Sequence, residues 1–249
     1  MENKTDFEKK DETFSECVRC KGRVDQKIIK YTVSGKEETM TIANQVCPGC
    51  AILHEAEANY RLAEENAKER LLESGLTKRQ QKYSFDNFKP EAGTRAAWRA
   101  LQNYVLSDKG VFVYGETCGI GKTHLMASLA KKFIKQGHRI LWVNCTTYLH
   151  GLRQGFEKEN KGKYLSIQKL VDAPILFIDD IGVEVESAWV TQTLYQILND
   201  RYENEKPTFI TSNFGLEEIE ESLGQPIASR IADMCDFFNM SGTDHRKLA

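Results

Sequence analysis

A glycine-rich stretch that ends in Lys122 and Thr123, VFVYGETCGIGKT, carries residue types that bind phosphate. Its glycines can turn backbone N–H groups inward, and the stretch opens a helix whose N-terminus favours anions. In loops of this kind the lysine reaches the β- and γ-phosphates of a nucleotide, and the next hydroxyl ligates Mg²⁺. The sequence therefore predicts a P-loop for ATP and Mg²⁺.

The spacing of this loop departs from the usual pattern. Gly115 and Gly121 are separated by one residue more than usual, so either Cys118 is inserted or Glu116 occupies the first glycine position. We expect the motif to function in both cases. The predicted nucleotide-binding residues of the loop and the helix start are Gly115, Glu116, Thr117, Cys118, Gly119, Ile120, Gly121, Lys122, Thr123 and His124.

Two further apolar runs end in polar side chains. The strand predicted over Pro174–Ile178 is followed by Asp179 and Asp180, a Walker B pattern in which the first carboxylate holds Mg²⁺ and the second polarises the attacking water. Many ATPases have Glu at the second position, so Asp180 predicts slow hydrolysis or an intervening water. Asn213 follows the strand predicted over Pro207–Thr211, where it either senses the γ-phosphate or caps the next loop.

Two CxxC pairs form a second candidate site. Cys17 and Cys20 are separated from Cys47 and Cys50 by residues 24–42, which alternate like a β-hairpin. Four thiolates satisfy tetrahedral Zn²⁺, and so small a segment has too little core to fold unaided. A redox CxxC is the alternative, but such motifs come singly. We expect a structural zinc module that binds either a protein partner or DNA, with a protein favoured.

The hydrophobic pattern predicts the elements that position these residues. The remaining strands are expected over Val111–Tyr114, Arg139–Val143 and Phe237–Met240, and helices over Ala51–Ser74, Thr94–Ser107, Thr123–Gln136, Ala188–Asn204 and Leu216–Leu223, with another starting at Pro226.

Two segments between these elements allow more than one interpretation. Phe85 and Phe88 follow a basic linker over Thr77–Lys82 and either anchor it on the core, which we favour, or flank an adenine ring. Residues 148–164 interleave aromatic side chains with Arg153, Lys158, Lys161 and Lys163. That pattern suits single-stranded DNA, but a solvated helix with a loop explains it equally well.

Composition limits the class of protein. The 249 residues are 41% hydrophobic and 28% charged, with a formal net charge of −2, so any nucleic-acid contact must come from a local patch. The charged start has no apolar signal region and no run is long enough for a membrane helix, so we expect a cytoplasmic protein without a membrane partner.

The stretches YSFDNF, GETCGIGKTHLM, ILFIDDIGVEVES, RYENEKPTFITSN, IASRI and GTDHR occur in an order that resembles the AAA+ ATPases of the bacterial helicase loader group, the DnaC, DnaI and IstB-like family. The resemblance implies an α/β fold with a parallel five-stranded sheet in the order 5-1-4-3-2. It assigns ATP and Mg²⁺ binding to Lys122 and Thr123, the Walker B pair to Asp179 and Asp180, and sensor 1 to Asn213. Arg230 would be the arginine finger of a neighbouring subunit's site, and the catalytic set would be Lys122, Asp180, Asn213 and Arg230.

The resemblance also implies an organisation and a function. We expect a zinc module over residues 1–57, a helical and basic linker over 58–83 and an AAA+ ATPase domain over 84–249, with no further C-terminal domain. Such a protein would bind a replicative helicase, place it on single-stranded DNA and form a homo-oligomer with ATP. The alternatives are an IstB-like transposition helper ATPase and a nonhydrolysing zinc-ribbon adaptor.

Overall fold

The computed structural model describes residues 14–17, 19–21, 23–33, 36–43, 46–155, 165–182 and 187–247. The chain divides into two compact units, with the boundary between Ala63 and Glu64. This boundary falls inside α1 (Pro48–Glu73), a helix that begins at the second CxxC pair.

The N-terminal unit contains a small antiparallel sheet. Its strands β1 (Phe14–Glu16), β2 (Arg23–Val33) and β3 (Lys36–Ala43) lie in that order, and Ile28 pairs with Thr41. The hairpin predicted between the CxxC pairs is therefore confirmed. The buried apolar cluster of this unit is very small: Cys17, Val24 and Cys50, with Val46 and Cys47 packed beside them.

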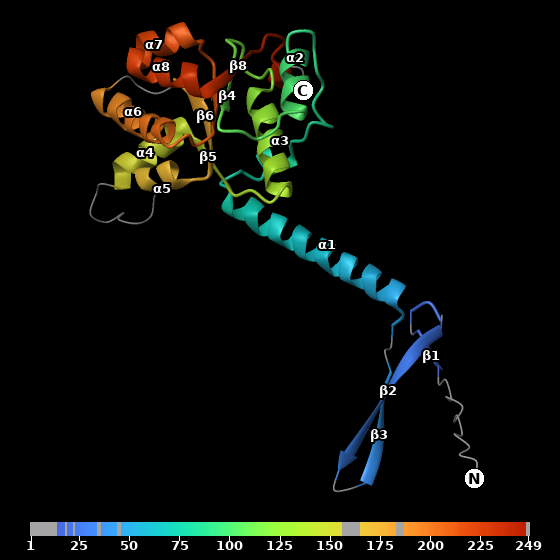
Figure 1. The fold of residues 1–249 in the computed structure, drawn as a ribbon. Coiled ribbons are helices and arrows are strands. Elements are labelled where there is room, and N and C mark those ends of the chain that lie inside the picture. The colour runs from blue at the N-terminus through green and yellow to red at the C-terminus, as the bar shows by residue number, and fades with distance from the viewer. Residues whose placement is uncertain are drawn as a thin grey trace, which may run out of the picture. The chain divides into compact units, whose positions relative to one another are not determined.

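The second unit is built on a parallel sheet of five strands in the order β5-β6-β7-β4-β8 (Figure 1). The bounds are β4 (Gly110–Tyr114), β5 (Ile140–Asn144), β6 (Ile175–Ile181), β7 (Thr208–Ser212) and β8 (Cys235–Asn239). Numbered within this unit, the strand order is 2-3-4-1-5. This is the predicted order 5-1-4-3-2 read from the opposite edge of the sheet, so the predicted sheet is confirmed. The strand that precedes the P-loop thus lies between β7 and β8.

Helices cover both faces of this sheet (Figure 1). Alternate residues of one strand face opposite sides, so Val111 packs with α2 and α3 while Phe112 packs in the cluster that contains the later helices. The first pair is α2 (Arg95–Gln102) and α3 (Lys122–Lys135). The second group is α4 (Cys145–Gly155), α5 (Ile167–Asp172), α6 (Ala188–Glu203), α7 (Leu216–Leu223) and α8 (Gln225–Met234).

Two predicted boundaries are wrong. The helix expected to reach Ser107 ends at Gln102, because the side-chain amide of Asn103 donates to the carbonyl of Arg99 and the chain then turns. Strand β6 runs on to Ile181 instead of stopping at Ile178, with an irregular register against β7. Both Walker B carboxylates therefore belong to the strand and are not part of the loop after it.

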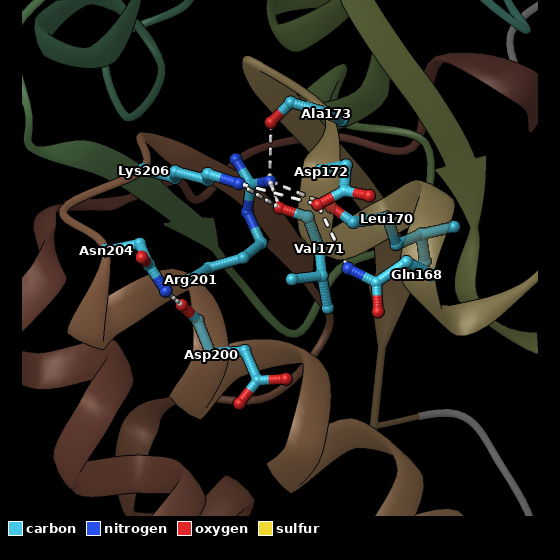
Figure 2. Close-up of polar contacts among 9 residues, drawn as sticks. All are labelled: Gln168, Leu170, Val171, Asp172, Ala173, Asp200, Arg201, Asn204 and Lys206. Carbon is cyan, nitrogen blue, oxygen red and sulfur yellow. Dashed lines mark hydrogen bonds and ion pairs between the residues drawn. The ribbon is translucent and has the colours of Figure 1, made fainter.

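A buried arginine, Arg201, contacts the end of α5 (Figure 2) and also the start of β7. The fully buried guanidinium of Arg201 donates to the carbonyls of Leu170, Ala173 and Pro207, each within 2.7 to 2.8 Å, and its Nε donates to Oγ1 of Thr208. Burial lowers the pKa of Arg201 to about 9. Neutral oxygens at the end of a short helix thus satisfy a charge inside the core.

Candidate functional site: a phosphate-binding cavity and a cysteine cluster

A cavity of about 760 Å³ lies at the carboxyl ends of β4, β6 and β7. It is lined by two groups of residues, those that the motifs predict and those from two other segments. The first group is Cys118, Gly119, Gly121, Lys122, Thr123, His124, Asp179, Asp180 and Asn213; the second is Thr77, Arg79, Gln80, Tyr83, Asn87, Phe88, Lys89, His245 and Arg246. A crevice at this edge of an α/β sheet is the usual place for a nucleotide.

Lys122 folds back into its own loop. Its buried ammonium donates to the carbonyl oxygens of Gly115 at 2.6 Å and Thr117 at 3.1 Å. Burial is the main cause that lowers the pKa of Lys122, and nearby charges of both signs act on it. These two hydrogen bonds hold a cation inside the loop, which fits the binding of a polyphosphate.

The glycines of the loop are required by its shape. Gly119 and Gly121 have φ angles of +78° and +99°, which L side chains rarely adopt. A Cβ on Gly121 would lie 2.5 Å from the ring of Phe88, which packs against the loop from the linker side. The nearby Ile120 is fully buried in the core, so its side chain anchors the loop.

Cys118 lies on the cavity side of the loop. The side chain is exposed, lines the cavity and places its Sγ 3.9 Å from Oδ1 of Asn213. The helix start at Lys122 is regular, since Leu125 N–H bonds to the carbonyl of Gly121 at 3.0 Å. The unusual spacing therefore leaves the lysine and threonine in helical geometry. Four of the predicted loop residues do not line the cavity themselves: Gly115, Glu116, Thr117 and Ile120.

The predicted magnesium ligands are brought together. Thr123 Oγ1 donates to Oδ1 of Asp179 at 2.9 Å, and Thr211 Oγ1 donates to the same oxygen at 2.7 Å. Burial, with the charge of Asp180 as the second cause, raises the pKa of Asp179 to about 6. A hydroxyl and a buried carboxylate beside a phosphate loop are a donor set that suits Mg²⁺.

Asp180 and Asn213 also face the cavity. The backbone of Asp180 lies in the left-handed region, with φ +59°, and its N–H donates to Oγ1 of Thr211 at 2.8 Å. A non-glycine residue in this region is uncommon and concentrates at functional sites. The two side chains predicted for water polarisation and phosphate sensing therefore share one cavity with Lys122.

His124 serves the linker as well as the cavity. Its ring stacks on Tyr83 with centroids 4.3 Å apart, and its Nε2 lies 3.0 Å from the carbonyl of Ser84 and 2.9 Å from Oδ1 of Asn87. Lys131, about two turns further along α3, donates to the backbone carbonyls of Gln81 and Tyr83. The aromatic YSFDNF stretch is thus anchored on α3, and part of it forms the cavity wall.

Arg246 is a cavity residue to which the sequence assigned no role. The GTDHR stretch that contains it follows β8 and turns back to the P-loop, where His245 N–H donates to the carbonyl of Gly119 at 3.4 Å. The sequence did contain a signal, because Arg246 belongs to the GTDHR stretch on which the family resemblance partly rests. Sequence reasoning lacked the turn that brings it there.

Arg230 does not line the cavity. Its guanidinium donates to Oδ1 of Asn199 at 3.0 and 3.1 Å and to the hydroxyl of Tyr195 at 3.1 Å, and it lies over the Tyr195 ring. Arg230 is held on α6 within its own subunit, away from the lining of its own cavity.

The four predicted zinc ligands converge. The sulfur atoms of Cys17, Cys20, Cys47 and Cys50 all lie within 4.8 Å of one another. In both CxxC turns the N–H four residues after the first cysteine donates to its carbonyl at 2.9 Å. Backbone N–H groups, that of Cys47 first, lower the pKa of Cys17 to about 6, which favours the thiolate that binds metal. The four sulfur atoms suit a metal ion with tetrahedral coordination, in a unit whose hydrophobic core is very small.

The same unit also contains an ion pair. Arg19, between the first two cysteines, pairs with Glu57 of α1 at 2.7 Å. This contact ties the first CxxC turn to the helix that follows the second one.

The basic and aromatic stretch over residues 148–164, which suits single-stranded DNA, lies partly outside the described residues, because 156–164 are not described. Within the described part, Arg153 on α4 is exposed.

In the part of the chain that the structure describes, we find no helix with the length and apolarity needed to cross a bilayer.

The fold and the cavity together define a nucleotide-binding protein of the AAA+ class, with a P-loop, a Walker B strand and a parallel sheet in the order 2-3-4-1-5. Residues 50–247 match the family described as IstB-like ATP binding protein. The chain therefore belongs to the IstB-like ATP-binding family.

Two curated relatives of the chain are replicative helicase loaders. The chain is 26% identical over 162 residues to the replicative helicase loader DnaC of Escherichia coli (strain K12), which covers 64% of this chain and 66% of that protein. It is 28% identical over 113 residues to the replicative helicase loader DnaI of Bacillus subtilis (strain 168), covering 45% of this chain and 35% of that protein. A crystal structure of the DnaC helicase loader superposes with a TM-score of 0.58 at 24% identity, over 66% of this chain and 100% of that one. The chain is thus homologous to these loaders, and the match spans about two thirds or less of the length of the two curated relatives.

Proposed function

We propose that this protein is an ATP-dependent loader of a replicative DNA helicase. The observation that carries the proposal is the homology to the DnaC and DnaI loaders, together with a family match over residues 50–247 that includes the P-loop and Walker B residues of the cavity. In this account the protein binds the hexameric helicase, helps place it on single-stranded DNA in the cytoplasm, and forms a homo-oligomer when ATP is bound.

The P-loop side of the cavity would hold the nucleotide. Lys122 is the cation for the β- and γ-phosphates, and the backbone of the loop supplies N–H groups around them. The hydroxyl of Thr123 and the carboxylate of Asp179, which already share a hydrogen bond of 2.9 Å, would hold Mg²⁺. The ion would neutralise charge that develops on the phosphates during hydrolysis.

The opposite side of the cavity would carry out hydrolysis. Asp180 is placed to orient and polarise a water, and Asn213 to contact the γ-phosphate. Arg246 adds a second cation to Lys122 at the cavity wall. Arg230 would complete the site of a neighbouring subunit, because its own subunit holds it on α6, outside its own cavity.

Two substitutions separate binding from turnover. Lys122→Ala should abolish or greatly weaken ATP binding, because it removes the one point charge held inside the loop. Asp180→Asn should leave binding nearly intact and stop turnover, since a group that polarises water acts on the transition state. Wild-type ATP affinity in both variants would reject the assigned roles.

The N-terminal unit would bind the helicase. Its Cys₄ cluster is proposed to hold one structural Zn²⁺, and the surface stabilised in this way would bind protein. The division into a zinc module at 1–57, a linker at 58–83 and an ATPase domain at 84–249 is part of this proposal.

A second candidate is a transposition helper ATPase that assembles on duplex DNA, because the matching family is named for IstB. A pull-down separates the two. The immobilised protein is incubated with the replicative helicase of the same organism, with and without ATP, and Lys122→Ala serves as the control. We expect ATP-dependent retention of helicase by the wild type alone. Failure to retain the helicase, together with ATP-dependent binding of duplex DNA, would favour the transposition helper.

A further inference from the structure

The carboxylate of Glu91 holds the C-terminal segment 241–247 at two points. Its Oε2 accepts a hydrogen bond from the N–H of Thr243 at 3.2 Å, and its Oε1 lies 3.3 Å from Nε2 of His245. Glu91 lies in the turn before α2 and is more than 150 residues away from these partners in the sequence. A single side chain thus connects the entry of the ATPase core to the GTDHR stretch.

The turn that carries Glu91 is itself well fixed. Its carbonyl accepts the N–H groups of Thr94 at 3.2 Å and Arg95 at 2.9 Å, and its own N–H donates to Oγ1 of Thr94, a buried residue. On the other side, a Cβ at Gly242, where φ is +155°, would lie 2.8 Å from Oε2 of Glu91. The glycine lets the two segments approach closely, so the carboxylate is an anchor of defined position.

The far side of the held segment touches the P-loop. His245 N–H donates to the carbonyl of Gly119, and a Cβ on Gly119 would collide with the side chain of Asp244. The same Asp244 accepts the N–H of Arg246 at 3.0 Å. Segment 241–247 therefore lies between Glu91 and the loop, and its last described turn places Arg246 in the cavity lining.

Charge explains why an anchor is needed. Arg246 and Lys122 are like charges that act on each other across the cavity, so they repel when no anion lies between them. This repulsion opposes the placement of Arg246 beside the P-loop, and contacts of segment 241–247 with the rest of the core counteract it. Glu91 supplies one such contact at Thr243 and His245, and its side chain is 35% exposed, so this contact adds little to folding stability by itself.

We propose that Glu91 is a positioning residue that keeps Arg246 at the phosphate end of the cavity. The inference rests on the proposed ATP site. It predicts that Glu91 contributes to nucleotide binding only through Arg246, although Glu91 does not line the cavity.

A double-mutant cycle on the full chain tests the proposal. The dissociation constants of Mg²⁺-ATP are measured by calorimetry for wild type, Glu91→Ala, Arg246→Ala and the double variant. We expect about a fivefold to tenfold loss of affinity in each single variant and no further loss in the double variant, because residues that act as one unit are not additive. Glu91→Gln, which keeps an oxygen for the Thr243 N–H, should recover part of the loss, and Glu221→Ala on α7 serves as an exposed carboxylate control with wild-type affinity.

Hydrogen exchange of the nucleotide-free protein gives a second readout. The peptide covering 241–247 should exchange faster in Glu91→Ala than in wild type, with α3 unchanged. The proposal is overturned if Glu91→Ala binds ATP like the wild type, if its loss multiplies with that of Arg246→Ala, or if exchange of the segment is unchanged. Wild-type binding no better than that of Lys122→Ala would instead reject the ATP site itself, and this inference with it.

Discussion

The hydroxyl of Thr211, buried on β7, donates a hydrogen bond of 2.7 Å to Oδ1 of Asp179 on β6. The same oxygen of Thr211 accepts the N–H of Asp180, which holds that residue in its left-handed conformation. One side chain on the neighbouring strand thus fixes both Walker B residues. It acts where the β6–β7 register is irregular and the backbone ladder cannot do so.

We predict that Thr211→Val weakens both folding and metal-dependent nucleotide binding. Valine has the same shape but leaves a buried N–H and a carboxylate oxygen short of one partner, at a cost of about 1–3 kcal/mol. Chemical unfolding and Mg²⁺-dependent ATP binding measure the two effects. Thr211→Ser keeps the hydroxyl and should stay near wild type; equal losses in the serine and valine variants would contradict the hydrogen-bond explanation.

Asp179 should make the nucleotide-free protein sensitive to pH. Its pKa is raised from 3.8 to about 6, so folding loses stability as pH rises from about 4 through 6, where the carboxyl is ionised in the unfolded chain and still protonated in the folded one. Asp179→Asn removes this charge and keeps an oxygen for both threonine hydroxyls. We expect the variant to be more stable than wild type at pH 7.5, by on the order of 1–3 kcal/mol, and close to it at pH 4.

Thermal unfolding at the two pH values, without nucleotide or metal, measures this difference. The same variant should lose Mg²⁺-dependent ATP binding, and wild-type binding should weaken as pH falls below about 6. A stability gap that does not change between pH 4 and pH 7.5 would show that Asp179 is ionised in the folded protein without penalty.

The sheet could be predicted from the sequence because its strands are short apolar runs flanked by polar residues. The motif order then supplied the strand order. The end of β6 could not be predicted, because two consecutive aspartates are typical of a loop. The side chain that keeps them in the strand, that of Thr211, lies 31 residues after Asp180 in the sequence. Arg201 is missed for a similar reason: a helix pattern places arginine in solvent, and only the fold supplies the carbonyls that accept its hydrogen bonds.

The candidate site shows the same limit. Lys122, Thr123 and Asp179 could be predicted because each stands at a fixed offset from a strand. Arg246 and Glu91 are joined by the return of the chain to the P-loop, which no local spacing encodes.

The cysteine cluster predicts one Zn²⁺ per chain. Each CxxC turn provides only half of a tetrahedral shell, so Cys47→Ser should lose the metal and unfold the N-terminal unit. Nucleotide binding by residues 64–249 should remain largely intact, since that unit has its own core. Native mass spectrometry of protein purified under reducing conditions measures the metal; protein without zinc and with a folded N-terminal unit would reject the site.

Arg230 predicts that hydrolysis depends on assembly. An arginine finger supplied by a partner is worth on the order of 10³ to 10⁵ in rate, so Arg230→Ala and Lys122→Ala should each be inactive alone. Mixed together, they should recover activity at interfaces that join an intact Lys122 site to an intact Arg230. Arg230→Lys, which keeps the charge but loses the paired bonds to Asn199, tests whether the held geometry matters.

The opposite results are clear for this prediction. Full activity of Arg230→Ala by itself, or no recovery in mixtures that demonstrably co-assemble, would leave Arg230 as a structural link between α8 and α6. Tyr195 and Asn199 would then account for its position completely.

Transfer of the replicative helicase onto a closed circle of single-stranded DNA tests the central claim most directly. Helicase, protein and ATP are incubated with the circle, and the helicase that stays on the DNA after gel filtration at raised salt is quantified. The account predicts that wild-type protein increases the retained helicase several-fold, that Lys122→Ala does not, and that Cys47→Ser fails because it no longer binds the helicase. Equal retention with wild type, with Lys122→Ala and without the protein would contradict ATP-dependent helicase loading.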